Sequence, residues 1–137
     1  MQAPIFAYMK RIVSILGGLA AAVAVIALIE MIGHMIFAVP VPADMKTKEE
    51  MAAYVASLPL GAFMSVLIAM VLGSFTGGFV ATKINKENGK VNATLVAIIL
   101  MTLGIVNLVM IPHPIWFMVV NLVLYVPFAW IGFRLAK

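Results

Sequence analysis

Four long apolar stretches, separated by short polar segments, constrain this chain more than any other feature. They cover about residues 12–37, 60–81, 91–111 and 115–135. A helix needs roughly 20 apolar residues to cross the hydrocarbon core of a bilayer, and only a helix satisfies its backbone hydrogen bonds within one such segment. The sequence therefore predicts an all-α integral membrane bundle of four transmembrane helices, which forms a single domain over residues 1–137.

The composition excludes a water-soluble domain. Hydrophobic residues make up 65% of the 137 residues and charged residues 10%, whereas soluble domains are nearer half apolar and a quarter charged. We expect the net charge of +4 to orient the chain in the lipid bilayer and to contact anionic headgroups, so we predict no nucleic-acid partner. The sequence has no cysteine, which excludes disulfides, thiolate metal sites and cysteine nucleophiles.

The distribution of Lys and Arg predicts which way the chain crosses the membrane. Seven of them lie at the N-terminus, in the second gap and at the C-terminus, against two in the first gap and none in the third. Because basic residues collect on the cytoplasmic side, we expect both termini to be cytoplasmic. The seven are Lys10, Arg11, Lys83, Lys86, Lys90, Arg134 and Lys137, and the two are Lys46 and Lys48.

The first outer gap contains the signature of a short helix. Thr47 and Glu50 have the spacing of a capping box, in which each side chain satisfies a backbone N–H at the start of a helix. Apolar residues then recur at helical spacing as far as Leu58. We predict a short amphipathic helix over about residues 47–57, lying on the outer surface of the membrane.

Small residues recur every four positions in the second span. Such spacing lets two helix backbones approach closely, which favours helix association in lipid. We interpret the rows as packing within the bundle, against a matching patch on the first span; a homodimer face is the alternative. The second-span residues are Gly73, Gly77 and Ala81, with Ser74, Gly78 and Thr82 in a neighbouring row; the first-span patch is Gly17, Gly18, Ala21 and Ala22.

Five polar residues are predicted to meet in the outer half of the membrane. Glu30 lies in the first span, and a carboxylate in hydrocarbon is costly enough to suggest a function. His34 lies one turn later on the same face, and His113 should lie at the same level. Asn107 and Asn121 lie about two turns deeper. We predict one inward-facing polar cluster.

Three interpretations of this cluster stay open. In the first, its hydrogen bonds tie helices together, because buried polar groups usually find partners. In the second, Glu30, His34 and His113 bind a divalent metal ion, with Asp44 as a candidate fourth ligand. In the third, Glu30 titrates within a proton or cation pathway. The sequence shows no arrangement of a catalytic triad and no phosphate-binding loop.

Four segments carry a resemblance to known proteins: residues 30–34 (EMIGH), 54–61 (YVASLPLG), 73–81 (GSFTGGFVA) and 107–116 (NLVMIPHPIW). They resemble a group of small bacterial four-helix inner-membrane proteins that carry no assigned activity. This resemblance implies a bacterial inner-membrane protein with a four-helix bundle. Glu30 and Gly33 also resemble the Glu-x-x-Gly of small multidrug-resistance transporters, although here the Glu lies near the outer end of its helix.

Three classes of function follow from these features. Smooth small-residue faces and the lack of catalytic groups favour a non-catalytic accessory subunit of a membrane complex, or a self-associating bundle, over an enzyme. Its partners would be other membrane chains or further copies of itself. The alternatives are a small proton-coupled transporter that uses Glu30 and a metal-binding protein at the outer face.

Overall fold

The computed structural model describes residues 2–137, so the domain predicted over 1–137 differs from the described chain only at Met1. All the regular secondary structure of the described chain is helical, without a strand. It contains four long helices, one short helix and a single 3₁₀ turn. In order these are α1 (Gln2–Ile36), α2 (Lys48–Ala56), α3 (Leu60–Ile84), η1 (Lys86–Asn88), α4 (Gly89–Met110) and α5 (Ile115–Ala136).

The prediction of an all-helical bundle with four candidate spans is confirmed. All four long helices are long and apolar enough to cross a membrane. The first span was predicted to begin at Ile12, but α1 begins at Gln2. Lys10 and Arg11 end the apolar stretch without ending the helix, because both are good helix formers. Pro4 is tolerated because it lies in the first turn, where its missing N–H breaks no hydrogen bond.

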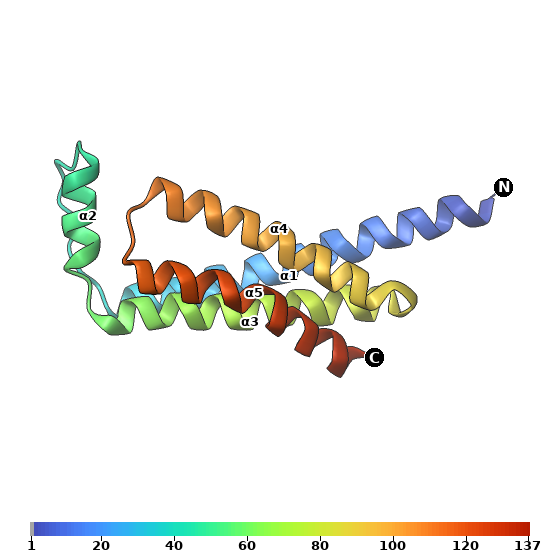
Figure 1. Cartoon of the computed structure of the whole chain (residues 1–137). Helices are drawn as coiled ribbons and strands as arrows, with labels where there is room; N and C mark the ends of the chain where they lie inside the picture. The colour runs from blue at the N-terminus through green and yellow to red at the C-terminus, as the bar shows by residue number, and fades with distance from the viewer. Residues whose placement is uncertain (1) are drawn as a thin grey trace.

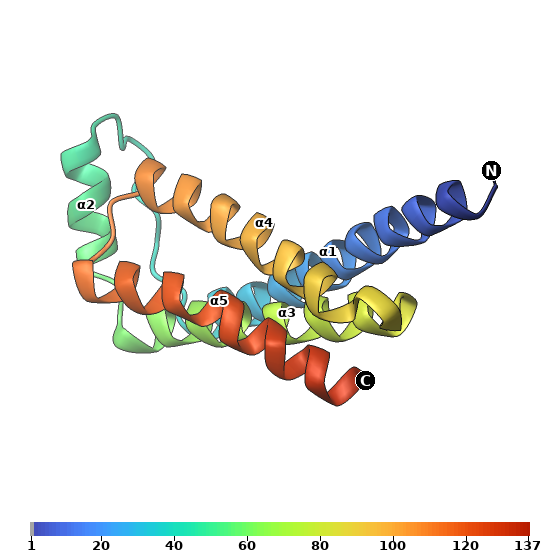
Figure 2. The same ribbon diagram turned by 45° about the vertical axis from the view of Figure 1, so that its right-hand side comes forward.

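The helix α3 is the centre of the bundle, since it contacts α1, α4 and α5. Figures 1 and 2 show α2 standing across one end of the bundle, with both chain termini at the other end. We call these the α2 end and the termini end. In both views α4 leaves the other long helices as it runs towards the α2 end, and the start of α1 projects beyond the termini end.

Glycines let the helices touch closely in the half of the bundle near the termini end. A Cβ atom on Gly18 of α1 would lie 2.7 Å from the carbonyl oxygen of Gly77 on α3. A Cβ atom on Gly78 would collide with the backbone of Ala129 on α5, and one on Gly132 with the backbone of α3. The two rows of small residues on α3 therefore face two different helices, α1 and α5. Both rows form contacts between helices of the same chain.

A second cluster of buried side chains lies at the α2 end. The helix α2 contributes Val55, which packs with the aromatic rings of Phe63 and Phe117. The predicted capping box starts this helix: the Glu50 N–H donates to Thr47 Oγ1 at 3.2 Å, and the Thr47 N–H donates to Glu50 Oε2 at 3.1 Å. The predicted surface helix over 47–57 therefore corresponds to α2.

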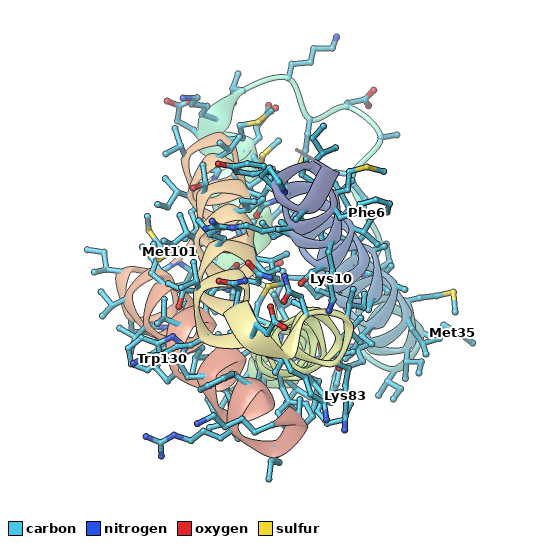
Figure 3. The ribbon with its side chains drawn as sticks, turned by 90° about the vertical axis from the view of Figure 1, so that its right-hand side faces the viewer. Phe6, Lys10, Met35, Lys83, Met101 and Trp130 are labelled. Carbon is cyan, nitrogen blue, oxygen red and sulfur yellow. The ribbon has the colours of Figure 1, made fainter. Side chains whose placement is uncertain are left out.

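Large apolar side chains cover the outside of the bundle. Ile115 is 80% exposed and Met35 76%, and the view onto the termini end in Figure 3 shows Met35 and Trp130 pointing away from the helices. A soluble monomer rarely exposes apolar surface continuously. The surface of the four long helices is therefore suited to lipid.

Candidate functional site

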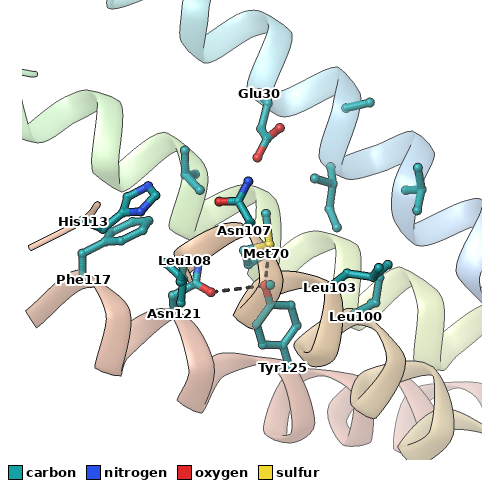
Figure 4. A pocket seen from close by; sticks show the side chains of 15 residues that line it. Glu30, Met70, Leu100, Leu103, Asn107, Leu108, His113, Phe117, Asn121 and Tyr125 are labelled. Carbon is teal, nitrogen blue, oxygen red and sulfur yellow. Dashed lines mark hydrogen bonds between the residues drawn. The ribbon is translucent and has the colours of Figure 1, made fainter. Parts of the chain in front are cut away.

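A cavity of about 310 Å³ lies inside the bundle, in the half near the α2 end. Small-molecule sites in proteins have volumes of roughly 300–1,000 Å³, so the cavity can hold a small ligand. All four long helices and the α4–α5 turn contribute to its walls, as Figure 4 shows from close by. The lining residues are Val23, Ile26, Ala27, Glu30, Val66, Met70, Leu100, Leu103, Gly104, Asn107, Leu108, His113, Phe117, Asn121 and Tyr125.

The structure brings four of the five predicted polar residues to this cavity. Glu30 comes from α1, Asn107 from α4, His113 from the α4–α5 turn and Asn121 from α5. His34 lines a neighbouring cavity of about 260 Å³, which also includes Glu30 and His113 in its walls. Glu30 and His34 are one helical turn apart on α1, so His34 lies closer to the α2 end. Glu30 therefore lines both cavities, whereas His34 lines only the second.

Glu30 is half-buried, and within residues 2–137 its carboxylate forms no hydrogen bond or salt bridge. Figure 4 shows the Glu30 and Asn107 side chains pointing towards one another across the cavity. Glu30 is the only Asp, Glu, Lys or Arg among the fifteen lining residues. The cavity thus contains one carboxylate and no Lys or Arg. The basic side chains near Glu30 are two histidines, His113 in the cavity wall and His34 one turn further along α1.

His113 is held in one orientation by its surroundings. Its Nδ1 atom lies 2.6 Å from the carbonyl oxygen of Ile111, and its ring stacks on Phe117 with 5.1 Å between ring centroids. A carbonyl oxygen can only accept, so this contact requires the proton on Nδ1. In the neutral ring, Nε2 is then left as an acceptor, which gives the cavity a second group that attracts a hydrogen-bond donor.

Tyr125, which was not predicted from the sequence, is buried at the back of the cavity. Its hydroxyl lies 3.2 Å from Asn121 Oδ1 and 3.2 Å from Met70 Sδ. The amide oxygen is the stronger acceptor of the two, and this bond fixes the Asn121 side chain. The only sequence signal for Tyr125 was its position one turn after Asn121 on the same helix face.

The arrangement gives no support to a three-ligand metal site. Among residues 2–137, no three His, Asp or Glu side chains lie close enough together to hold one ion. Glu30 and His113 share both cavities, whereas His34 lines only one. Asp44, the candidate fourth ligand, lines a separate surface hollow beside α2.

A second polar cluster, also missed in the sequence, lies near the termini end. The buried Ser14 hydroxyl donates to the carbonyl oxygen of Ala81 at 2.6 Å and accepts from Asn92 Nδ2 at 3.0 Å. These bonds join α1, α3 and α4. Asn92 Oδ1 is buried with no hydrogen-bond partner in the described chain. The cluster ties helices together and lines none of the cavities described above.

Comparison of the chain with models of known protein families, with curated proteins and with solved structures found no match. The two resemblances drawn from the sequence therefore stay predictions, and any function has to be argued from the site itself.

Proposed function

We propose that this chain is a membrane protein that binds a small amphipathic amine in the cavity beside Glu30. The observation that carries the proposal is a half-buried carboxylate in a cavity that has no Lys or Arg among its lining residues. An unpaired ion costs several kcal/mol when it is taken out of water, and a bound ammonium group would offset that cost. The acceptor atom of His113 and the amide of Asn107 would complete the binding of the ammonium group.

The proposal includes an orientation in the membrane. The excess of Lys and Arg at the termini end favours placing that end in the cytoplasm of a bacterial cell, with α2 on the outer face of the inner membrane. The cavity would then lie in the outer half of the bilayer. Gly18, Gly77 and Gly78 pack closely against their neighbours near the termini end, so in this orientation the cavity would be closed towards the cytoplasm.

The ligand class can be tested with three probes of equal chain length. We would reconstitute the full chain in lipid nanodiscs and measure binding of hexylamine, hexanol and hexanoate by calorimetry. Hexylamine is protonated at neutral pH and should bind roughly tenfold or more tightly than hexanol, which corresponds to about 1.4 kcal/mol. Hexanoate should not bind, because its carboxylate would meet that of Glu30.

Glu30→Gln is the decisive variant, since it keeps the size of the side chain and removes its charge. The preference for hexylamine over hexanol should disappear in this variant. Glu49→Gln is the matched control, because Glu49 lies on α2 and lines neither cavity. Equal binding of hexanol and hexylamine by the unaltered chain, or an unchanged preference in Glu30→Gln, would refute the proposal.

The accessory-subunit function is the second candidate, and one observation favours it. Only 17% of the most apolar window of α1 is buried within the chain, against 44% for α3. The exposed surface of α1 therefore has room for a partner chain as well as for lipid.

Mass spectrometry of chains that co-purify from the native membrane tests this function: stoichiometric partner chains support a subunit, and a lone chain contradicts it. Elemental analysis of the same sample tests metal binding.

A further inference from the structure

The opening of the cavity can be located from the exposure of the residues that line it. On α1, Val23 and Ala27 are exposed, and on α4 Leu103 and Asn107 are exposed. The lining residues from α5 are buried: Phe117, Asn121 and Tyr125. The back wall is therefore closed by α5, and the opening lies between α1 and α4. We call this opening the α1–α4 mouth.

The mouth follows from the way α1 and α4 are held together. The two helices meet near the termini end, where Asn92 donates to Ser14 and Gly18 lies against Val96. Beyond this contact α4 runs away from α1 towards the α2 end, as Figures 1 and 2 both show. The gap at the level of Ala27 and Leu103 is lined by side chains that form the cavity wall.

Polarity changes along the length of the cavity. Glu30, Asn107 and His113 lie towards the α2 end, whereas Val23 and Leu100 lie towards the middle of the bundle. Val23 and Glu30 are seven positions apart on α1, which is about 10 Å along a helix. A ligand with a charged head and an apolar tail would match this gradient, with its head beside Glu30.

Contacts of α2 cover part of the α2 end, beside the neighbouring cavity that shares Glu30 and His113. Val55 of α2 is buried against Phe63 and Phe117, and the Tyr54 hydroxyl donates to the carbonyl oxygen of Val39 at 3.1 Å, which ties α2 to the preceding connection. A ligand that entered from water on this side would have to pass these contacts or cross the neighbouring cavity of about 260 Å³.

We infer that the cavity is loaded sideways from the outer leaflet, through the α1–α4 mouth, by a lipophilic amine whose alkyl chain lies between α1 and α4. This inference rests on the proposed function, since it names the substrate class and the route for the same site. The complementary charges of the ammonium group and Glu30, and the apolar lining below Glu30, select this ligand over a neutral or anionic lipid.

Binding and release rates test the route. We would measure both rates for dodecylamine with the full chain in nanodiscs, by rapid mixing. Ala27→Trp places a large side chain in the mouth and should slow binding roughly tenfold. Because Ala27 also lines the cavity, Kd should rise as well; release should nevertheless be slower, whereas weakened binding without a blocked route would make release faster. Ala38→Trp is the matched control on the α2 side, since Ala38 is exposed and lines only the neighbouring cavity. It should change neither rate.

A second measurement avoids bulky substitutions inside the bundle. Because the chain has no cysteine, Leu103→Cys can be labelled with a nitroxide at a single position in the mouth. Dodecylamine should lower the collision rate of this label with oxygen dissolved in the lipid. The same label at Val119→Cys, an exposed position on α5 that does not line the cavity, should show no change.

The outcomes separate the inference from the proposed function. If no amine binds, or if Glu30→Gln binds as well as the unaltered chain, the proposed function fails and the inference fails with it. If binding depends on Glu30 but Ala38→Trp slows it and Ala27→Trp does not, only the sideways route is wrong. The label at position 103 could also be shielded from oxygen before any amine is added, in nanodiscs that hold two chains. The mouth would then be an interface with a second copy of the chain, and the inference would be overturned.

Discussion

The two halves of the bundle use different residues where their helices face one another. Near the termini end, Gly18, Gly77 and Gly78 bring backbones into contact, and Ser14 joins three helices through hydrogen bonds. Towards the α2 end, α4 diverges from the other long helices (Figures 1 and 2), and a cavity that contains the Glu30 carboxylate lies between them. One half therefore fixes the positions of the helices, while the other leaves space for a ligand.

This difference indicates that the half near the termini end stabilises the fold, while the half near the α2 end binds the ligand. Helices in lipid gain little from burying apolar surface, so close packing and interhelical hydrogen bonds hold them together. Both contributions are concentrated near the termini end. Substitutions there should mainly change stability, and substitutions around the cavity should mainly change ligand affinity.

The largest effect is expected from Gly78→Ala. The added methyl group would collide with the backbone of Ala129, which cannot move aside as a flexible side chain can. Overpacking of this kind costs about 3 kcal/mol, more than the gain of about 1 kcal/mol from replacing glycine by alanine within a helix. Thermal unfolding in mild detergent should show a clearly lowered Tm.

Gly17→Ala is the matched control for this variant. A methyl group there would meet only the Cδ1 atom of Ile84, at 2.7 Å, and that atom ends a side chain that can rotate. Its Tm should stay close to that of the unaltered chain. An equal loss in both variants would contradict the prediction, because the loss would then not depend on the backbone contact between α3 and α5.

The next largest effect is expected from Asn121→Leu, which keeps the size of the side chain and removes both polar atoms. The variant takes away the acceptor of the Tyr125 hydroxyl and the amide group that faces the cavity. Hexylamine affinity should fall roughly tenfold, or about 1.4 kcal/mol, with a smaller change in Tm. Thr102→Val is the control, because the Thr102 hydroxyl bonds only within α4. If Asn121→Leu binds hexylamine with full affinity, the ligand does not reach Asn121 and binds only beside Glu30.

The course of the long helices could be predicted from the sequence because it depends on local hydrophobicity. The predicted second span began at Leu60, where α3 begins, and the predicted third and fourth spans end within a residue of α4 and α5. The start of α1 was not predictable in this way, because Lys10 and Arg11 interrupt the apolar stretch but not the helix.

The candidate site was predictable only in part. Glu30 stood out because a carboxylate is rare within a span, and helical geometry was enough to bring Asn107 and Asn121 near it. Ser14 and Asn92 gave no such signal, since they are 78 positions apart and each is ordinary in its own segment. The α1–α4 mouth depends on the divergence of α4, which is a property of the packed bundle and not of any one segment.

Ser14→Ala should produce a smaller loss of stability, confined to the half near the termini end. It leaves the Ala81 carbonyl and the Asn92 amide without their partner, and interhelical hydrogen bonds in membranes contribute about 0.6 kcal/mol on average. We expect a loss of about 1 kcal/mol, measured by unfolding in detergent, with amine affinity unchanged. Ser65→Ala is the control because the Ser65 hydroxyl bonds within α3. A change in amine affinity in Ser14→Ala would show that the two halves are coupled.

The smallest effect is expected at α2 when the pH is lowered. Acidification should destabilise this helix and leave the rest of the bundle unchanged. Hydrogen bonds from the backbone N–H groups of Lys46 and Thr47 hold the pKa of the Glu50 carboxyl below its usual value. Because this pKa is lower in the folded chain, the ionised capping box stabilises α2 above the usual carboxylate range, and that stability is lost as the pH falls through the lowered pKa.

Hydrogen-exchange protection of residues 48–56, corrected for the intrinsic pH dependence of exchange, measures this effect. Protection of α2 should fall on acidification in the unaltered chain, while protection around Ser14 and Gly18 stays constant, since the capping box contacts none of the termini half. Glu50→Ala, which removes the acceptor of the Thr47 N–H, should have low protection at neutral pH and little further change with acid, whereas Glu49→Ala should behave as the unaltered chain. A parallel loss of protection in both halves would mean that they unfold as one unit, and the division between a packed half and a binding half would not hold.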